Sequence, residues 1–251
     1  MKYTLDTIPV LDAFKQDCQC PMCRLQILCE DGYIDGLLSS AYMEPECRVR
    51  TNKTGFCSRH YAQMYERRNR LGLALMTHTH LQELIRSLEE TMGTPAKKNS
   101  RLPFFTASVQ EDGRPAKIRA GIDACDICDQ LDKTMRRYAF TVIRLVLDKP
   151  EFKSRFEKTG ACLPHTALLL DLSEETLSGR ERETFESFLK DVTLHRLHEI
   201  ESNLYDFTQQ FDYRNAGVAP TQAARDSVEH ALNRLAGAII GDEAARPAHN
   251  D

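Results

Sequence analysis

Four short pairs of cysteine and histidine residues are the part of this 251-residue sequence best suited to chemistry. Two are Cys-x2-Cys pairs and two are Cys-x2-His pairs, and the two kinds alternate along the chain. The first set of ligands is Cys20, Cys23, Cys57 and His60, and the second is Cys125, Cys128, Cys162 and His165. Each member of the second set follows its counterpart by 105 positions, which indicates one ligand arrangement that occurs twice.

Three thiolates and one imidazole form a normal tetrahedral ligand set for zinc, with the ligands in close pairs separated by a longer stretch. The sequence therefore predicts two Cys3His sites and two zinc ions per chain. We expect both sites to be structural, because four protein ligands close the coordination shell, whereas catalytic zinc keeps one position open. An iron–sulfur cluster on the same thiolates is the chemical alternative, and buried free thiols are the alternative without a metal.

The other three of the nine cysteines have no counterpart at this offset. Cys18, Cys29 and Cys47 correspond to Asp123, Thr134 and Phe152. An odd number of cysteines in a reducing compartment also argues against a disulfide framework. We therefore predict no metal role for these three cysteines, of which only Cys18 could compete with Cys20 for a metal.

Similarity around the ligands indicates an internal duplication. Pro45-Glu46 corresponds to Pro150-Glu151 at the same offset. Lys53-Thr54-Gly55 corresponds to Lys158-Thr159-Gly160. Because each copy contains one complete ligand set, we expect each repeat to be tied by its own zinc site.

Each Cys-x2-Cys pair is predicted to stand at the start of a helix, where unpaired N–H groups and the helix dipole stabilise thiolates. Pro21 is a favourable first helical residue. Apolar residues recur at intervals of three and four after the second pair: Leu131, Met135, Tyr138, Val142 and Leu145. The segment from Met43 to Gly55 contains Pro45 and suits a non-helical return, long enough when extended to bring the second ligand pair back to the first.

These patterns predict an all-α protein of two tandem helical repeats, each tied by a Cys3His zinc site, with a short C-terminal helix around Thr221–Ile240. The predicted domain bounds are 1–92 for the first repeat, 93–120 for a linker, 121–215 for the second repeat, 216–240 for the C-terminal helix and 241–251 for a disordered tail. The linker and tail are predicted from their proline, glycine and polar residues, which follow no helical period.

A second candidate site lies on the long helix expected before the C-terminal one. Asp191, His195 and Glu199 are spaced by four residues and share one helical face, a pattern that could hold a catalytic metal. The apolar residues of the same segment occupy another face, so we expect this stripe to face solvent. A metalloenzyme that uses the stripe, or a thiol-redox protein that uses a labile cysteine site, is the alternative function.

Composition restricts the remaining possibilities. The chain has 33 Lys and Arg against 37 Asp and Glu residues, a net charge of −4 that speaks against nucleic-acid binding. No apolar run approaches the roughly 20 residues of a membrane-spanning helix, and Met1–Val10 lacks the apolar core of an export signal, so we expect a cytoplasmic protein. No phosphate-binding loop or nucleophile elbow occurs. The favoured function is a non-enzymatic zinc scaffold that binds a protein or a small ligand.

Several segments are also distinctive beyond the ligand spacing: MKYTLDTIP at 1–9, TNK before Gly55-Phe56-Cys57, NRLGLAL at 69–75, HTHL at 78–81, CLPH at 162–165 and FDYRN at 211–215. With these segments the chain resembles a bacterial family of unknown function that has duplicated Cys-x2-Cys and Gly-x-Cys-x2-His elements. The resemblance extends to about residue 236, and some relatives carry the label of ABC transporter substrate-binding proteins. It implies a shared fold and supplies no established activity.

Overall fold

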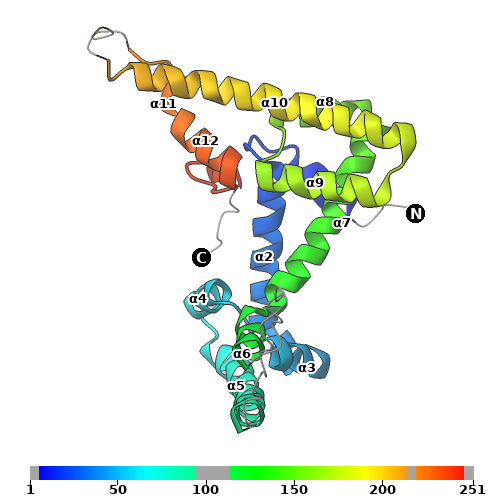
Figure 1. Cartoon of the computed structure of the whole chain (residues 1–251), viewed down its shortest axis with the longest axis vertical. Helices are drawn as coiled ribbons and strands as arrows, with labels where there is room; N and C mark the ends of the chain where they lie inside the picture. Colours follow the sequence, from blue (N-terminus) through cyan, green and yellow to red (C-terminus); the bar gives the residue numbers. More distant parts are fainter. Residues whose placement is uncertain (1–5, 94–113, 213, 215–218, 246–251) are drawn as a thin grey trace, which may run out of the picture. The chain divides into compact units, whose positions relative to one another are not determined.

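The computed structural model describes residues 6–93, 114–212, 214 and 219–245 of the chain (Figure 1). Within these residues the regular elements are twelve α-helices and two 3-10 turns, without a strand. The prediction of an all-α protein is therefore confirmed. None of the described helices combines the length and the apolar character required to cross a membrane.

The first six helices are α1 (Thr7–Ala13), α2 (Pro21–Ser39), α3 (Pro45–Thr54), α4 (Ser58–Glu66), α5 (Arg70–Gly93) and α6 (Arg114–Asp123). The next six are α7 (Asp126–Asp148), α8 (Pro150–Thr159), α9 (Leu163–Thr176), α10 (Gly179–Gln209), α11 (Gln222–Arg225) and α12 (Ser227–Ala236). The 3-10 turns span Ala41–Met43 and Glu243–Ala245.

The chain divides into two compact units. The central unit consists of Glu30–Leu131, and the terminal unit combines Met1–Cys29 with Asp132–Asp251. Helices α2 and α7 each contribute residues to both units. Each unit thus contains segments from both predicted repeats. The repeat bounds 1–92 and 121–215 stay a prediction about an internal duplication of the sequence.

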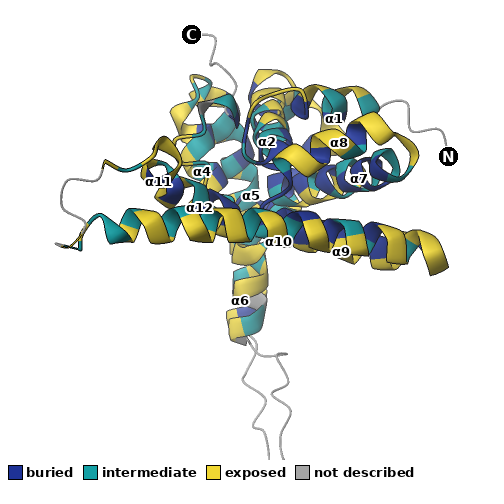
Figure 2. Ribbon diagram, turned by 90° about the horizontal axis from the view of Figure 1, so that it is seen from above, coloured by how far each residue is buried: buried dark blue, intermediate teal, exposed yellow. Residues whose placement is uncertain are grey.

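Aromatic residues form much of the terminal unit's core. The ring of Phe14, just after α1, lies 4.7 Å from that of Phe152 and 5.9 Å from that of Phe156, both on α8. The long helix α10 packs on α9, α11 and α12. Buried Phe185 and Leu189 recur on one face of α10 among exposed and half-buried residues (Figure 2). This one-sided burial is typical of a helix that lies on the surface of a core.

The central unit has its own apolar core. Ile34 of α2, Met64 of α4, Met76 of α5 and Ile127 of α7 are fully buried in one cluster. Helix α5 also packs on α3 and α6. The cluster includes Cys125, the predicted ligand directly before α7. Apolar packing therefore holds the start of α7 in place.

The predicted non-helical return between Met43 and Gly55 is wrong, because most of it forms α3. Pro45 is the first residue of this helix, where proline's missing N–H is not needed. Gly55 ends the helix with a φ of 61°, a conformation that side chains disfavour. The second copy repeats this arrangement in α8, which begins at Pro150 and ends before Gly160, with a φ of 64°.

The structure differs from the prediction in the linker, the C-terminal helix and the tail. Helix α6 begins at Arg114 within the predicted linker, of which 94–113 lies outside the described residues. The C-terminal helix is two helices, α11 and α12, and Gly237 ends α12 in a left-handed conformation. Of the predicted tail, 246–251 lies outside the described residues, whereas Ala245 is fully buried, so its first part is packed.

Candidate metal centres

The eight predicted ligands form two clusters of four in the structure. The terminal site consists of Cys20, Cys23, Cys162 and His165, and the central site of Cys57, His60, Cys125 and Cys128. In each cluster the four ligand atoms lie within 4.8 Å of one another. Both sets are Cys3His, as predicted. The described parts of the chain contain no further group of this kind.

The partners within each set differ from the prediction that every repeat is tied by its own site. Cys20 and Cys23 meet the pair from the second copy, and Cys125 and Cys128 meet the pair from the first. The return segment also differs from the expected one. The 19 residues of α2 carry the chain about 28 Å, whereas the 10 residues of α3 cover about 15 Å. The helical return thus reaches less far than an extended chain, and Cys57 lies in the central cluster.

All four ligand pairs use the same local geometry. The first cysteine of each pair stands directly before a helix, and the second ligand lies in its first turn. The four helices are α2, α4, α7 and α9. Each site therefore gathers two helix N-termini, whose free N–H groups and dipoles stabilise negative sulfur. This confirms the predicted helix starts at the Cys-x2-Cys pairs.

The terminal site is buried throughout. Nδ1 of His165 lies 3.0 Å from Sγ of Cys162, 3.4 Å from Sγ of Cys23 and 3.7 Å from Sγ of Cys20. The sulfurs of Cys23 and Cys162 are 3.5 Å apart, and the backbone N–H of Cys162 donates to Sγ of Cys20 at 3.3 Å. The four side chains converge, and none of these residues is more than 6% exposed.

The central site repeats this geometry. Nδ1 of His60 lies 3.1 Å from Sγ of Cys125, 3.2 Å from Sγ of Cys57 and 3.4 Å from Sγ of Cys128. The sulfurs of Cys57 and Cys128 are 3.9 Å apart. These two cysteines are half-buried, so this site is more accessible than the terminal one.

A carboxylate supports the imidazole of the central site. Nε2 of His60 lies 2.8 Å from Oε1 of Glu30, and Arg59 pairs with the same oxygen at 2.9 Å. With Nδ1 toward the sulfurs, Nε2 carries the proton and donates it to Glu30. Metal-binding histidines are commonly oriented by such a carboxylate, which also increases the basicity of the imidazole.

The distances fit zinc. Tetrahedral zinc with bonds of about 2.3 Å to sulfur and 2.0 Å to nitrogen places sulfurs about 3.8 Å apart and sulfur about 3.5 Å from nitrogen. The observed S–S distances of 3.5 and 3.9 Å, and S–N distances of 3.0 to 3.7 Å, bracket these values. Both sites can therefore hold a metal ion of this size.

Electrostatics favours a cation at each centre. Burial opposes ionisation of Cys125, but hydrogen bonds with His60 and backbone N–H groups lower its pKa to about 6. Burial and the neighbouring Cys125 raise the pKa of Cys128 to about 12. Burial opposes protonation of His60, yet its hydrogen bonds to Cys125 and Glu30 raise its pKa to about 9. A positive charge between the sulfurs is thus favoured. Three neighbouring thiolates repel one another, so they can coexist only with a cation between them.

The terminal site behaves in the same way. Burial alone would raise the pKa of Cys20, but hydrogen bonds from Cys162, Cys23 and His165 lower it well below its usual range. Hydrogen bonds with Cys162 and Cys20 instead raise the pKa of Cys23. Although burial opposes it, the hydrogen bond to Cys162 helps raise the pKa of His165 to about 10.

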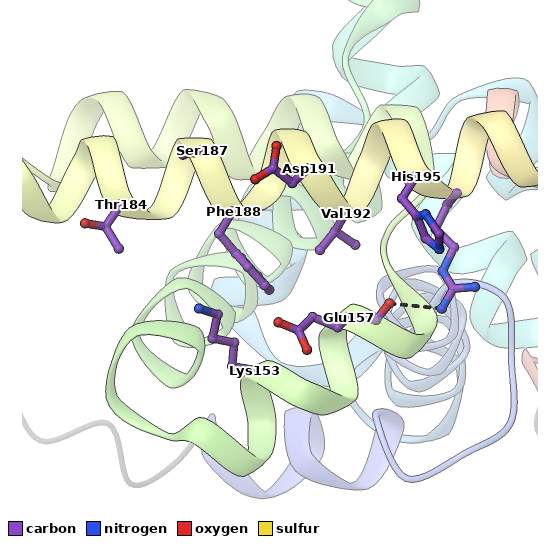
Figure 3. Close-up of a pocket in the computed structure, with 9 residues that line it drawn as sticks. Lys153, Glu157, Thr184, Ser187, Phe188, Asp191, Val192 and His195 are labelled. Carbon is purple, nitrogen blue, oxygen red and sulfur yellow. Dashed lines mark hydrogen bonds between the residues drawn. The ribbon is translucent and has the colours of Figure 1, made fainter.

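The stripe on α10 does not form a metal site. Asp191, His195 and Glu199 are exposed, as predicted. Asp191 and His195 line an open cavity of about 620 Å³ together with Lys153 of α8 (Figure 3). Glu199 pairs instead with Arg196 at 2.7 Å. The side chains of Asp191 and His195 diverge along the helix, so they do not present ligands to one ion (Figure 3).

The three cysteines without a counterpart lie outside both clusters. Cys18 and Cys47 are buried and Cys29 is half-buried. Burial raises the pKa of all three, that of Cys18 to about 12. Cys18 is not one of the four residues of the terminal cluster.

Sequence reasoning missed the residues around the ligands. Glu30 has no acidic counterpart in the other copy, because Met135 occupies the equivalent position. Nδ1 of His80 on α5 donates a hydrogen bond to the backbone oxygen of Asn52 at 2.8 Å, and its ring lies against Gly55 with no room for an added Cβ. Such contacts leave no pattern in a single sequence.

Comparison with known proteins identifies the family but no relative of known activity. Neither the search of curated proteins nor that of solved structures gave a match. The transporter label associated with the sequence resemblance stays untested. Residues 1–242 match a family of unknown function, DUF6062, and the chain belongs to this family.

Proposed function

We propose that this protein is a cytoplasmic zinc-binding scaffold in which each of two closed Cys3His sites stabilises the helical unit that contains it, and that these units bind a protein or small-ligand partner. The observation that carries the proposal is the tetrahedral spacing of four protein ligands in both clusters. S–S distances of 3.5 and 3.9 Å match zinc better than the larger separations imposed by a multi-iron cluster.

A structural role follows from the ligand count. Four protein ligands leave zinc without an open position for water or substrate. The α10 cavity, the other candidate for chemistry, lacks convergent ligands. The net charge of −4 supports a protein or small-ligand partner over nucleic acid. Nine unpaired cysteines suit a reducing compartment.

Elemental analysis and X-ray absorption of the purified full chain test this proposal. We expect two zinc ions per chain, each with three sulfur ligands and one nitrogen ligand. Cys23→Ser and Cys128→Ser should each remove one zinc ion, whereas His195→Ala, on the exposed stripe, should keep both. Iron in place of zinc, or an oxygen ligand from water, would contradict the proposal and support an enzyme.

A thiol-redox role is the second candidate, and one observation favours it. Cys57 and Cys128 are half-buried and their sulfurs are 3.9 Å apart. A peroxide could oxidise these two thiolates to a disulfide, taking up two electrons and two protons to give water, with loss of the zinc ion. Rapid release of one zinc ion per chain by dilute hydrogen peroxide, reversed by a thiol reductant, would support this role. Retention of both ions would exclude it.

A further inference from the structure

One arginine is buried beside the terminal site. Arg234 of α12 is only 6% exposed. Its Nη2 donates to the backbone oxygens of Gln19, at 3.1 Å, and of Thr159, at 3.0 Å. Gln19 directly precedes the ligand Cys20, and Thr159 lies three residues before the ligand Cys162. One guanidinium thus joins the two backbone segments that supply the ligands.

The hydrogen bonds of Arg234 do not account for its burial. Its Nε and Nη1 are buried and find no hydrogen-bond partner within the described part of the chain. An uncompensated buried cation is costly, because it loses its hydration without gaining an opposite charge. Negative charge on the nearby thiol groups of Cys20, Cys162 and Cys23 would stabilise the guanidinium, whereas the positive charge of Arg196 opposes it.

The zinc-loaded site would carry a net charge. A zinc ion with three thiolates and a neutral histidine has a net charge of −1. The loaded site would therefore place one negative charge beside one buried positive charge.

The segment that carries Arg234 also covers the terminal site. Gly237, just after α12, lies so close that an added Cβ would be 3.4 Å from Sγ of Cys23. Asp242 accepts a hydrogen bond from the backbone N–H of Gln19 at 2.8 Å, and the backbone oxygen of Ala244 accepts one from Arg24. These contacts stand directly before and after the Cys20–Cys23 pair.

We infer that Arg234 is the charge partner of the terminal zinc site and that it couples docking of the C-terminal cap, Ser227–Ala245, to zinc at that site. The inference rests on the proposed zinc at the terminal site. Arg234 is a positioning residue here: it holds the backbone of both ligand segments and neutralises the metal centre. By linkage, zinc stabilises the docked cap as much as the cap stabilises bound zinc.

The central site provides an internal control. Its imidazole is supported by the carboxylate of Glu30, which is paired with the half-exposed Arg59. The hydrogen bonds of Arg234, Asp242 and Ala244 described above join the cap to ligand segments of the terminal site. A change at Arg234 should therefore affect one of the two zinc ions.

The test compares Arg234→Met, which keeps much of the side-chain volume without the charge, with Arg234→Lys, which keeps the charge but not the planar fork. Arg225→Met, at an exposed arginine of α11, is the matched control. Zinc release to a chromogenic chelator and cleavage of the cap by subtilisin are measured on full-length, zinc-loaded protein. His165→Ala is included to remove zinc from the terminal site.

We expect Arg234→Met to release one zinc ion about 10-fold faster or more, the size of effect found when supporting residues of metal sites are lost. Arg234→Lys should show a smaller increase, and Arg225→Met none. The cap should be cleaved faster in both Arg234→Met and His165→Ala. If Arg234→Met does not fold, Arg234→Lys decides, because faster release of one ion and faster cap cleavage are expected there too.

Wild-type release and cleavage rates in the Arg234 variants would overturn the inference and leave the proposed function intact. Cleavage of the cap at the wild-type rate in His165→Ala would overturn the coupling as well. A wild-type chain without zinc at the terminal site would overturn both the inference and the proposed function.

Discussion

Removing one ligand of the terminal site should destabilise the whole terminal unit. Cys23 and His165 are 142 positions apart in the sequence, so a zinc ion that binds both closes a long loop. A cross-link of this span restricts the unfolded chain by about 5 kcal/mol in the chain-entropy relation used for disulfides. Domains are stable by only about 5–15 kcal/mol, so the loss of this cross-link is a large fraction of the total.

The corresponding change in melting temperature is easily measured. About 1 kcal/mol corresponds to 2–4 °C for a chain of this size, so His165→Ala should lower the melting temperature by about 10–20 °C. Calorimetry on the full chain, with zinc counted by elemental analysis in the same sample, provides the measurement. His195→Ala replaces an exposed histidine of the same unit and should melt like the wild type.

The reasoning has a clear point of failure. If His165→Ala loses one zinc ion and still melts within a degree or two of the wild type, the metal does not hold the unit together. An exchangeable metal with a functional role would then be the better explanation. If His165→Ala keeps both zinc ions but melts at a lower temperature than the wild type, the decrease in melting temperature would instead indicate lost packing of the imidazole.

Other predictions concern the central site. Peptide mapping after native alkylation should find half-buried Cys29 modified first, and metal-stripped protein should add Cys57 and Cys128; modification of these two with zinc still bound would contradict a closed site. Without metal, hydrogen bonds lower the pKa of the Cys125 thiol from the usual 9.0 to about 6. Below about pH 6 this thiol is protonated, so zinc binding must displace one more proton than it does at higher pH. Zinc affinity should then fall more steeply below about pH 6, and a slope that stays constant in chelator competition would refute this assignment. Glu30→Gln should weaken zinc binding about 10-fold or more, measured by the same competition, and an unchanged affinity would exclude support of His60 by the carboxylate.

The eight residues of the two clusters were predictable as candidate ligands because their signal is local. Cys-x2-Cys and Cys-x2-His place two ligands on one side of a helix start, and the local sequence largely determines that geometry. The constant offset separated Cys20 from the neighbouring Cys18 without any structural knowledge. Helix starts at Pro21 and after Cys125 followed from the same short segments.

The pairing of the ligands was not predictable from spacing. Both copies contain the same two kinds of pair, so exchange of partners between copies leaves the spacing unchanged. The extended-chain estimate gave only an upper limit for the reach of the Met43–Gly55 segment. Pro45 indicated a break in helical structure but instead begins α3, so the segment covers less distance than an extended chain would.

The supporting residues depend on tertiary structure. Glu30 lies seven residues after Cys23 and contacts His60 only once α4 is packed against α2. Arg234 is far from every ligand in sequence and reaches the terminal site through α12. Neither residue has an equivalent in the other copy, so the duplication that identified the ligands gives no information about them.

The exchanged pairing is the central claim, and NMR of the cadmium-substituted full chain tests it most directly. With an NMR-active cadmium isotope in place of zinc, through-bond couplings identify the ligand protons attached to each ion. We expect two cadmium resonances, one coupled to Cys20, Cys23, Cys162 and His165 and the other to the remaining four ligands. Coupling of Cys20 and Cys23 to the same ion as Cys57 and His60 would contradict the account.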